Sequence, residues 1–437
     1  MEKIELKKQI QKYSEYKDSG IDWVGKIPKE WSLFKLKQIS KIETGNTPPR
    51  VEGDFYDDNG LIWAKPNNLN EFKPITDSKE KLSLEGANFA RRIPAGAVLV
   101  NCIGDIGRIG LAGVELTTNQ QINSVIFSDK LYPEFGKYMI YISAAEMKSR
   151  SNSVVVAILN KTQQGNIEYT LPSKEDQKKI ADYLDAKTAI IDKSIEQKEK
   201  LVELLKDKRA AVINRAVTRG LDEKAELVDS GVEWIGKVPK GWGVEKLKFS
   251  GQAIIGLTYS PDDVVGEEGT LVLRSSNVQN NSIELNDNVY VKKLIPRSLK
   301  TKKGDILICS RNGSAALIGK SAVIDGPGEG STFGVFMSIF RSRYWRYMAY
   351  FFKSELFFFQ LRSSATSTIN QLTIDDLKNI ISTIPKIEEQ EKIAKYLDEK
   401  ITKIDECSEK IKKSIELLQE YKSSLIFNVV TGKVKVE

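Results

Sequence analysis

The chain has 437 residues, 41% apolar and 29% charged, which is an ordinary composition for roughly two to four globular domains. It has no histidine, and its three cysteines, Cys102, Cys309 and Cys407, lie far apart. This composition excludes histidine-based catalysis and argues against zinc sites and disulfide frameworks. The net charge of +7 permits a nucleic-acid partner without demonstrating one. Because no apolar run approaches the roughly 18 residues of a membrane span, we expect a cytoplasmic protein with no membrane partner.

Two sequence blocks each occur twice in the chain. The block D-S-G-x-x-W-x-G-K-x-P-K begins at Asp18 and returns at Asp229, and 12 of 20 positions are identical over the extended block. The block Q-x-K-I-A-x-Y-L-D begins at Gln177 and returns at Gln390, with 10 of 16 positions identical. Two such blocks at nearly the same offset predict a tandem repeat of one unit of about 210 residues.

The repeat predicts the order of domains along the chain. We expect an N-terminal segment at 1–16, a first domain at 17–172, a central helix at 173–219, a second domain at 220–385 and a C-terminal helix at 386–437. The interiors, residues 50–170 and 261–383, share few identities. The repeated blocks at the two ends of each unit form its frame. Similar frames with different interiors indicate one architecture that serves two tasks.

The domain interiors read as mixed α and β structure. Short apolar strands are predicted at 98–100 and 306–308, each after a turn. Residues 344–361 are rich in aromatic side chains, on which nucleic-acid bases could stack. A helix packed into the domain core is the favoured interpretation.

Residues 173–218 and 386–431 carry apolar residues with a period of 3.5 over about five heptads, which is a coiled-coil signal. Pro172 and Pro385 stand just before these stretches, where proline is tolerated. We therefore predict an α+β fold in which two tandem mixed α/β domains are separated by two long helices, paired as an antiparallel coiled coil with a pseudo-twofold axis. Packing of each helix on its own domain, or a coiled coil between two copies, are the alternatives.

Three stretches resemble catalytic or cofactor-binding motifs, but none has the required spacing or residues. Gly313–Ser321 resembles a phosphate-binding loop but has five residues between its glycines where four are required. Gly104–Gly110 has the wrong spacing for a dinucleotide loop. The stretch Asn46–Arg50 lacks the order and the aromatic residue of a base-methyltransferase clamp. Catalysis within this chain is therefore not expected.

Recognition chemistry remains. Basic and amide side chains gather near predicted turns, and these residue types suit guanine edges, adenine edges and phosphates. The candidate DNA-binding residues are Lys65, Asn67, Asn68, Arg91, Arg92, Arg108, Gln120, Gln121 and Asn123 in the first domain, and Arg274, Ser275, Asn277, Arg311, Asn312, Lys320, Arg341 and Arg343 in the second. No catalytic or metal-binding residue is predicted.

The doubled blocks, the Gly45-x-Thr47-Pro48 loop and the helix ends at Thr218 and Thr431 resemble those of type I restriction-modification specificity subunits. The second loop, from Gly256 to Pro261, has two additional residues. The resemblance implies two target recognition domains that read the halves of a split, asymmetric site in double-stranded DNA.

The same resemblance implies partners. Two methyltransferase subunits would use S-adenosylmethionine, two restriction subunits would use ATP and Mg, and this chain would hold no cofactor itself. Two other classes stay open: an enzyme that itself methylates or cuts DNA, and a coiled-coil scaffold that reads no sequence.

Overall fold

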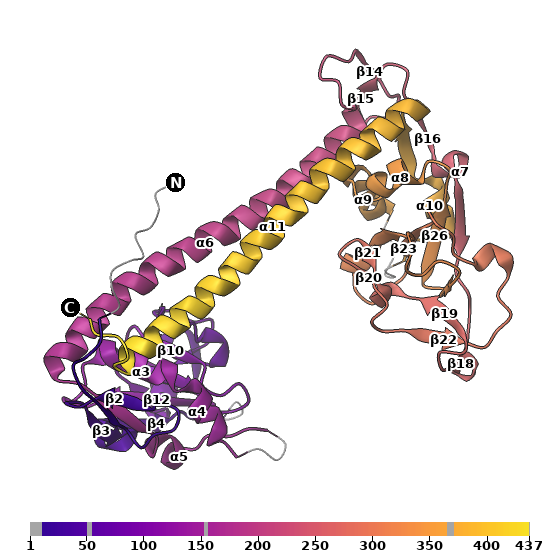
Figure 1. Ribbon diagram of the computed structural model, residues 1–437. Coiled ribbons are helices and arrows are strands. Elements are labelled where there is room, and N and C mark those ends of the chain that lie inside the picture. Colours follow the sequence, from indigo (N-terminus) through magenta and orange to yellow (C-terminus); the bar gives the residue numbers. More distant parts are fainter. Residues whose placement is uncertain (1–10, 50–54, 153–155, 365–370, 437) are drawn as a thin grey trace. The chain divides into compact units, whose positions relative to one another are not determined.

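The computed structural model describes residues 11–49, 55–152, 156–364 and 371–436. The chain divides into two compact units, Met1–Gln197 with Ser414–Glu437, and Lys198–Lys413 (Figure 1). Each unit holds one globular domain with one end of each long helix. We call the globular parts domain 1 (residues 11–173) and domain 2 (residues 220–386). Most of the N-terminal segment predicted at 1–16 lies outside the described residues.

Domain 1 contains thirteen strands and five short helices among its described residues. The strands are β1 (Tyr16–Asp18), β2 (Lys26–Pro28), β3 (Ser32–Lys35), β4 (Ser40–Thr44), β5 (Tyr56–Ala64), β6 (Pro74–Ile75), β7 (Lys81–Leu82), β8 (Arg92–Ile93), β9 (Val98–Asn101), β10 (Ile109–Ala112), β11 (Leu116–Thr118), β12 (Ile122–Phe127) and β13 (Glu168–Leu171). The helices are α1 (Leu36–Ile39), α2 (Leu84–Phe89), α3 (Pro133–Ile142), α4 (Ala144–Ser149) and α5 (Lys161–Gly165).

Domain 2 contains a similar set of elements. The strands are β14 (Leu227–Asp229), β15 (Lys237–Pro239), β16 (Gly243–Lys246), β17 (Gln252–Ile255), β18 (Val264–Val265), β19 (Thr270–Leu273), β20 (Val278–Gln279), β21 (Ser282–Ile283), β22 (Val289–Val291), β23 (Ile306–Cys309), β24 (Ser321–Val323), β25 (Thr332–Phe333), β26 (Met337–Arg341) and β27 (Ile381–Ile384). The helices are α7 (Leu247–Ser250), α8 (Trp345–Phe351), α9 (Glu355–Ser364) and α10 (Ile374–Asn379).

The two domains share one topology. The order β4-β12-β9-β10 in domain 1 returns as β17-β26-β23-β24 in domain 2. In a second sheet, β5 pairs with β7 and lies parallel to β11, as β19 pairs with β22 and lies parallel to β25. The strands predicted at 98–100 and 306–308 are β9 and β23, the buried centres of the first sheets. The tandem repeat of mixed domains is thus confirmed.

Helices α3 and α8 supply much of the domain cores. Phe135 and Tyr138 of α3 are at most 1% exposed, and so are Tyr347, Phe351 and Phe357 in the aromatic segment of domain 2. Most of the aromatic segment is therefore core, as favoured from its sequence, although Phe359 is 43% exposed.

The long helices are α6 (Lys174–Arg219) and α11 (Ile387–Val430). In unit 1 the start of α6 meets the end of α11, where the Lys422 Nζ lies 2.8 Å from Asp192 Oδ1. In unit 2 the end of α6 meets the start of α11, where the Arg209 Nε lies 3.0 Å from Asp405 Oδ1. In each unit the beginning of one long helix thus lies beside the end of the other, which is the arrangement of an antiparallel pair. Among the described residues, no helix could span a membrane.

The repeated blocks have structural roles in both copies. The Asp18 carboxylate accepts a 2.8 Å hydrogen bond from the backbone of Gly20, which has φ +71°, and Asp229 with Gly231 repeats this turn. Each helical block buries apolar residues and accepts a hydrogen bond of 2.6 Å from a tyrosine: Tyr138 donates to Asp185, and Tyr350 to Asp398. The identities thus preserve the frame and leave the loops free to differ.

Candidate nucleic-acid interface

An open groove of about 1040 Å³ lies in domain 2. Four loops contribute to its lining, residues 259–261, 274–276, 311–313 and 334–337. Each loop comes at the end of a strand, after β17, β19, β23 and β25 respectively. The paired strands, of which β23 and β25 are fully buried, therefore hold the loops in place, and the loop side chains can vary without disturbing the core.

Arg274 is fixed at one side of this groove. Its Nη2 atom lies 2.7 Å from Asp287 Oδ2 and 2.9 Å from the Asp287 carbonyl oxygen. Its backbone N–H donates to Asn277 Oδ1 at 2.9 Å, which closes a tight turn. The side chain is 33% exposed and lines the groove, so its guanidinium has its rotamer already set before any ligand binds.

Arg311 and Phe336 form a second feature of the groove. The Arg311 guanidinium lies 5.4 Å from the centre of the Phe336 ring, and the phenylalanine is 56% exposed. The Arg311 N–H donates to the Phe336 carbonyl at 3.0 Å, which joins the two loops. A cation stacked on an exposed ring offers both hydrogen-bond donors and a flat apolar surface, which suits a nucleic-acid base.

Domain 1 has corresponding loops with other side chains. Lys65 takes the place of Arg274: its backbone N–H donates to Asn68 Oδ1 at 2.8 Å, and its Nζ lies 2.5 Å from Glu80. The turn 119–121 takes the place of 334–336, because the Gln121 carbonyl accepts from the backbone of Cys102, directly after β9, as the Phe336 carbonyl accepts from Ser310, directly after β23. Amides therefore stand in domain 1 where domain 2 has apolar and aromatic side chains.

The structure brings together about half of the residues predicted to contact DNA. In domain 2, Arg274, Ser275, Arg311 and Asn312 line the groove, and the Asn312 Nδ2 donates to Ser275 Oγ at 3.3 Å. On the corresponding loops of domain 1 are Lys65, Asn67, Gln120 and Gln121, and Arg91 lies beside them because its N–H donates to Asn46 Oδ1 at 3.1 Å.

Other predicted residues have partners elsewhere in their own domain. Asn68 and Asn277 close the two tight turns, and Asn123, 1% exposed, donates to Leu159 and Gln164. Arg108 donates to the Leu69 carbonyl at 2.7 Å. Arg92 pairs with Glu115, Lys320 donates to Gln279, and Arg343 stacks on Tyr344. We leave these residues out of the interface, and their base contacts remain only a prediction from sequence.

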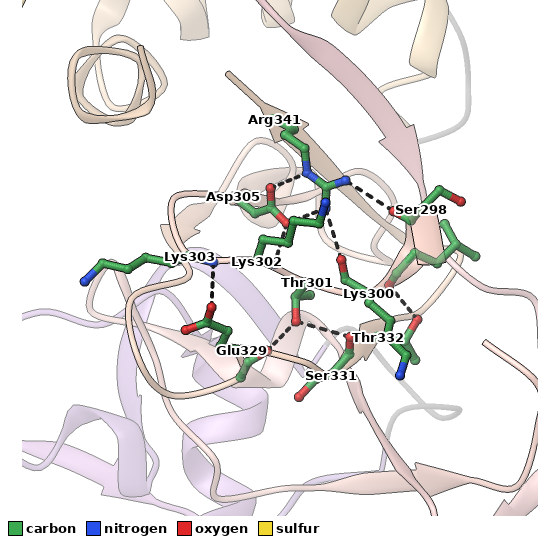
Figure 2. A network of polar contacts seen from close by, with 12 residues as sticks. Ser298, Lys300, Thr301, Lys302, Lys303, Asp305, Glu329, Ser331, Thr332 and Arg341 are labelled. Carbon is green, nitrogen blue, oxygen red and sulfur yellow. Dashed lines mark hydrogen bonds and ion pairs between the residues drawn. The ribbon is translucent and has the colours of Figure 1, made fainter. Parts of the chain in front are cut away.

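Arg341 also has a structural place (Figure 2). Its Nε and Nη2 atoms each lie 2.7 Å from a carboxylate oxygen of Asp305, whose side chain is 1% exposed. The same guanidinium donates to the carbonyls of Ser298 and Lys300 at 3.5 and 3.1 Å. Arg341 therefore fastens the loop before β23 rather than facing the groove.

Sequence reasoning missed the apolar part of the interface. Tyr259 and Phe336 line the groove, and neither is among the predicted residues, because the argument for base stacking considers only the dense aromatic segment 344–361. Placing Thr332–Phe333 on Thr117–Thr118, both short strands before a turn, would have aligned Phe336 with Gln121.

The described residues contain no group of three or more acidic or cysteine side chains that could hold a metal ion. Cys102 and Cys309 are buried, and burial raises the pKa of both thiols, that of Cys102 to about 11. A thiol with a raised pKa is a poor nucleophile, so neither side chain is suited to covalent catalysis.

Two domains of one topology, with different side chains on corresponding surface loops, define a tandem recognition protein. The sequence matches the family described as the type I restriction modification DNA specificity domain over residues 28–204 and 263–417. Because the match covers more than half of the chain, the chain belongs to this family.

Two relatives illustrate the range of similarity. The type I restriction enzyme EcoKI specificity subunit of Escherichia coli is 29% identical over 207 residues, which are 46% of this chain and 44% of that protein. The chain thus matches less than half the length of that relative. The MjaVIII specificity subunit of Methanocaldococcus jannaschii is 23% identical over 94% of this chain and 95% of its own length.

Solved structures share the fold. A chain from a study of assembly and conformational transition in a type I R-M system has a TM-score of 0.71, at 15% identity, and covers 92% of this chain and 98% of its own length. The HsdS subunit from Thermoanaerobacter tengcongensis has a TM-score of 0.51, at 15% identity, with coverage of 93% and 98%. Tandem mixed domains with long helices are thus an established fold.

Proposed function

We propose that this chain is the DNA sequence-recognition subunit of a type I restriction-modification complex, and that each domain reads one half of a split, asymmetric site. The observation that carries the proposal is the contrast between corresponding loops. Val335 and Phe336 stand in domain 2 where domain 1 presents Gln120 and Gln121 on the equivalent turn. One frame with two sets of side chains is suited to reading two different sequences.

The chemistry of the loops supports base reading in both domains. Arginine donates two parallel hydrogen bonds to guanine O6 and N7, and glutamine or asparagine pairs similarly with adenine. Arg274 is held by Asp287 in a set rotamer, so less side-chain entropy is lost when it binds. We therefore assign base contacts to Arg274 and Arg311 in domain 2 and to Gln120 in domain 1.

The partners complete the proposal. Two methyltransferase subunits would dock on this chain and use S-adenosylmethionine, and two restriction subunits would use ATP and Mg. The chain itself would supply recognition and no catalysis. The relatives named as specificity subunits of restriction enzymes support this division of labour.

The proposal is tested by mapping methylated adenines across a host genome that carries the chain with its methyltransferase subunits. A split motif with two defined halves is expected. Arg311→Ala should relax the half read by domain 2 alone, and the matched variant Gln120→Ala the other half alone, because each contact is worth about 1–3 kcal/mol of discrimination. Relaxation of both halves by either variant would contradict the assignment.

Two measurements address the other classes of protein. If the purified chain alone transfers methyl groups to DNA, then it is an enzyme. If it binds DNA with its partners but shows no sequence preference, then it is a scaffold. Either result would overturn the proposal.

A further inference from the structure

Leu294 is 92% exposed, more than any other large apolar side chain in the described part of the chain. It lies in the loop between β22 and β23, within residues 292–303. This stretch of twelve residues has six basic side chains and no acidic one. All six are exposed, namely Lys292, Lys293, Arg297, Lys300, Lys302 and Lys303.

Four of the six cations are free of carboxylate partners. Lys293 lies 3.4 Å from Asp263, and Lys303 lies 3.0 Å from Asp325. The side chains of Lys292, Arg297, Lys300 and Lys302 make no ion pair with any described residue. An exposed apolar side chain in a loop that also carries unpaired cations is complementary to a polyanion with an apolar interior, and stacked DNA has that character.

The loop is held at both ends. On one side Lys293 Nζ donates to the Thr258 carbonyl at 3.1 Å, which ties Leu294 to the loop that lines the groove. The next residue, Ile295, is 9% exposed and packs in the core. On the other side, Figure 2 shows Arg341 bonded to the Ser298 and Lys300 carbonyls. Leu294 therefore projects from a braced loop beside the base-reading groove.

We infer that Leu294 is a wedge that enters the DNA base stack next to the half-site read by domain 2, while the free cations bind the flanking phosphates. The inference rests on the proposed function and extends it to a residue that distorts DNA. Apolar wedges of this kind partly unstack a base step, and the energy this costs is offset by the phosphate contacts that the distortion permits.

Domain 1 offers a matched comparison. Leu84, the first residue of α2, follows β7 as Leu294 follows β22, and it is 75% exposed. Its neighbour is Glu85, and the nearby Arg91 and Arg92 are paired with Glu43 and Glu115. Because most of the cations near Leu84 in sequence, Lys81 included, are paired with carboxylates, Leu84 has a weaker attraction to phosphate and is not assigned as a wedge.

The test uses the full chain assembled with its methyltransferase subunits and DNA duplexes of the mapped site. 2-Aminopurine, which fluoresces more strongly when unstacked, is placed in turn at positions flanking the domain 2 half-site. A several-fold rise on binding is expected at one step. Leu294→Ala should abolish this rise, whereas Leu294→Phe and the control Leu84→Ala should retain it. Because Leu294 and Leu84 are exposed, the unfolding temperatures should stay unchanged.

The outcomes separate the two proposals. Any rise at the methylated adenine itself reflects base flipping and should persist in Leu294→Ala. If wild-type complex binds its site specifically and no flanking step brightens, or if the rise survives Leu294→Ala, the wedge is wrong and the proposed function stands. If no sequence-specific binding or methylation occurs, the proposed function fails and the wedge fails with it.

Discussion

At the scale of single residues, type and position in the sequence do not reveal a role. Arg311 and Arg341 both follow short apolar stretches, and both were predicted to contact DNA. One faces the groove on an exposed ring, and the other binds Asp305, which is 1% exposed. The difference depends on partners 25 to 36 residues away, which are set by strand pairing and not by local pattern.

The Arg341–Asp305 pair leads to a stability prediction. Burial and hydrogen bonding make removal of one partner costly, so Asp305→Asn should destabilise domain 2 by about 3 kcal/mol. The control is Asp325→Asn, which removes the exposed Lys303–Asp325 pair nearby and should cost less than about 0.5 kcal/mol. Amide hydrogen exchange in β23 and β26 measures both changes, and equal effects would show that the pair does not brace the loop.

At the scale of elements, the sequence predicts those helices and strands that have a clear local pattern of apolar residues. The heptads predict α6 and α11, and short apolar runs after turns predict β9 and β23. The parallel pairing of β5 with β11 joins residues that are more than fifty positions apart in the sequence, and no local pattern predicts it. The groove is formed by such pairings. Local sequence patterns therefore predict some of its lining residues but not its shape.

Lys353, in the turn between α8 and α9, gives a pH-dependent prediction. Burial, and then the charge of Arg209, lower its pKa from 10.5 to about 8. Between pH 8 and pH 10.5 the unfolded chain binds more protons than the folded protein, so the free energy of unfolding rises with pH. At pH 7 the buried lysine lowers the free energy of unfolding by roughly 3 kcal/mol, and at pH 10 by about 1 kcal/mol.

Lys353→Met should therefore stabilise unit 2 at pH 7, and its advantage over wild type should shrink by about 2 kcal/mol on going to pH 10. Urea denaturation at pH 7 and at pH 10 measures the free energy of unfolding of each variant. The exposed Lys395→Met serves as the control and should show no such change. An advantage for Lys353→Met that stays constant with pH would contradict the burial of this charge.

The paired helices lead to a prediction about the spacing of the two half-sites. Inserting one heptad after Val202 and one after Ile415 keeps the apolar seam in phase and adds about 10 Å to each helix. This corresponds to roughly three base pairs, with a rotation of about 100° that the complex must absorb. Any activity that survives should keep both half-site sequences and lengthen only the gap. Methylation mapping of an active variant with an unchanged gap would contradict this role.

At the scale of the whole molecule, both domains share one frame of strands and helices, and we propose that each domain reads its own half of the DNA site. The frame was predictable because its identities recur along the chain. The bases read by each domain were not, because they depend on loop geometry and on side chains that differ between the copies.

The most direct test replaces residues 50–170 with the corresponding segment of another family member and maps the methylated motif in a host with the methyltransferase subunits. Leu171 and the helical block from Gln177 lie outside the exchanged segment, and so does β3, the strand that pairs with β13. We predict that one half of the motif changes and that the other half is retained. A motif altered in both halves, or in neither, would contradict the claim that each domain reads its own half-site.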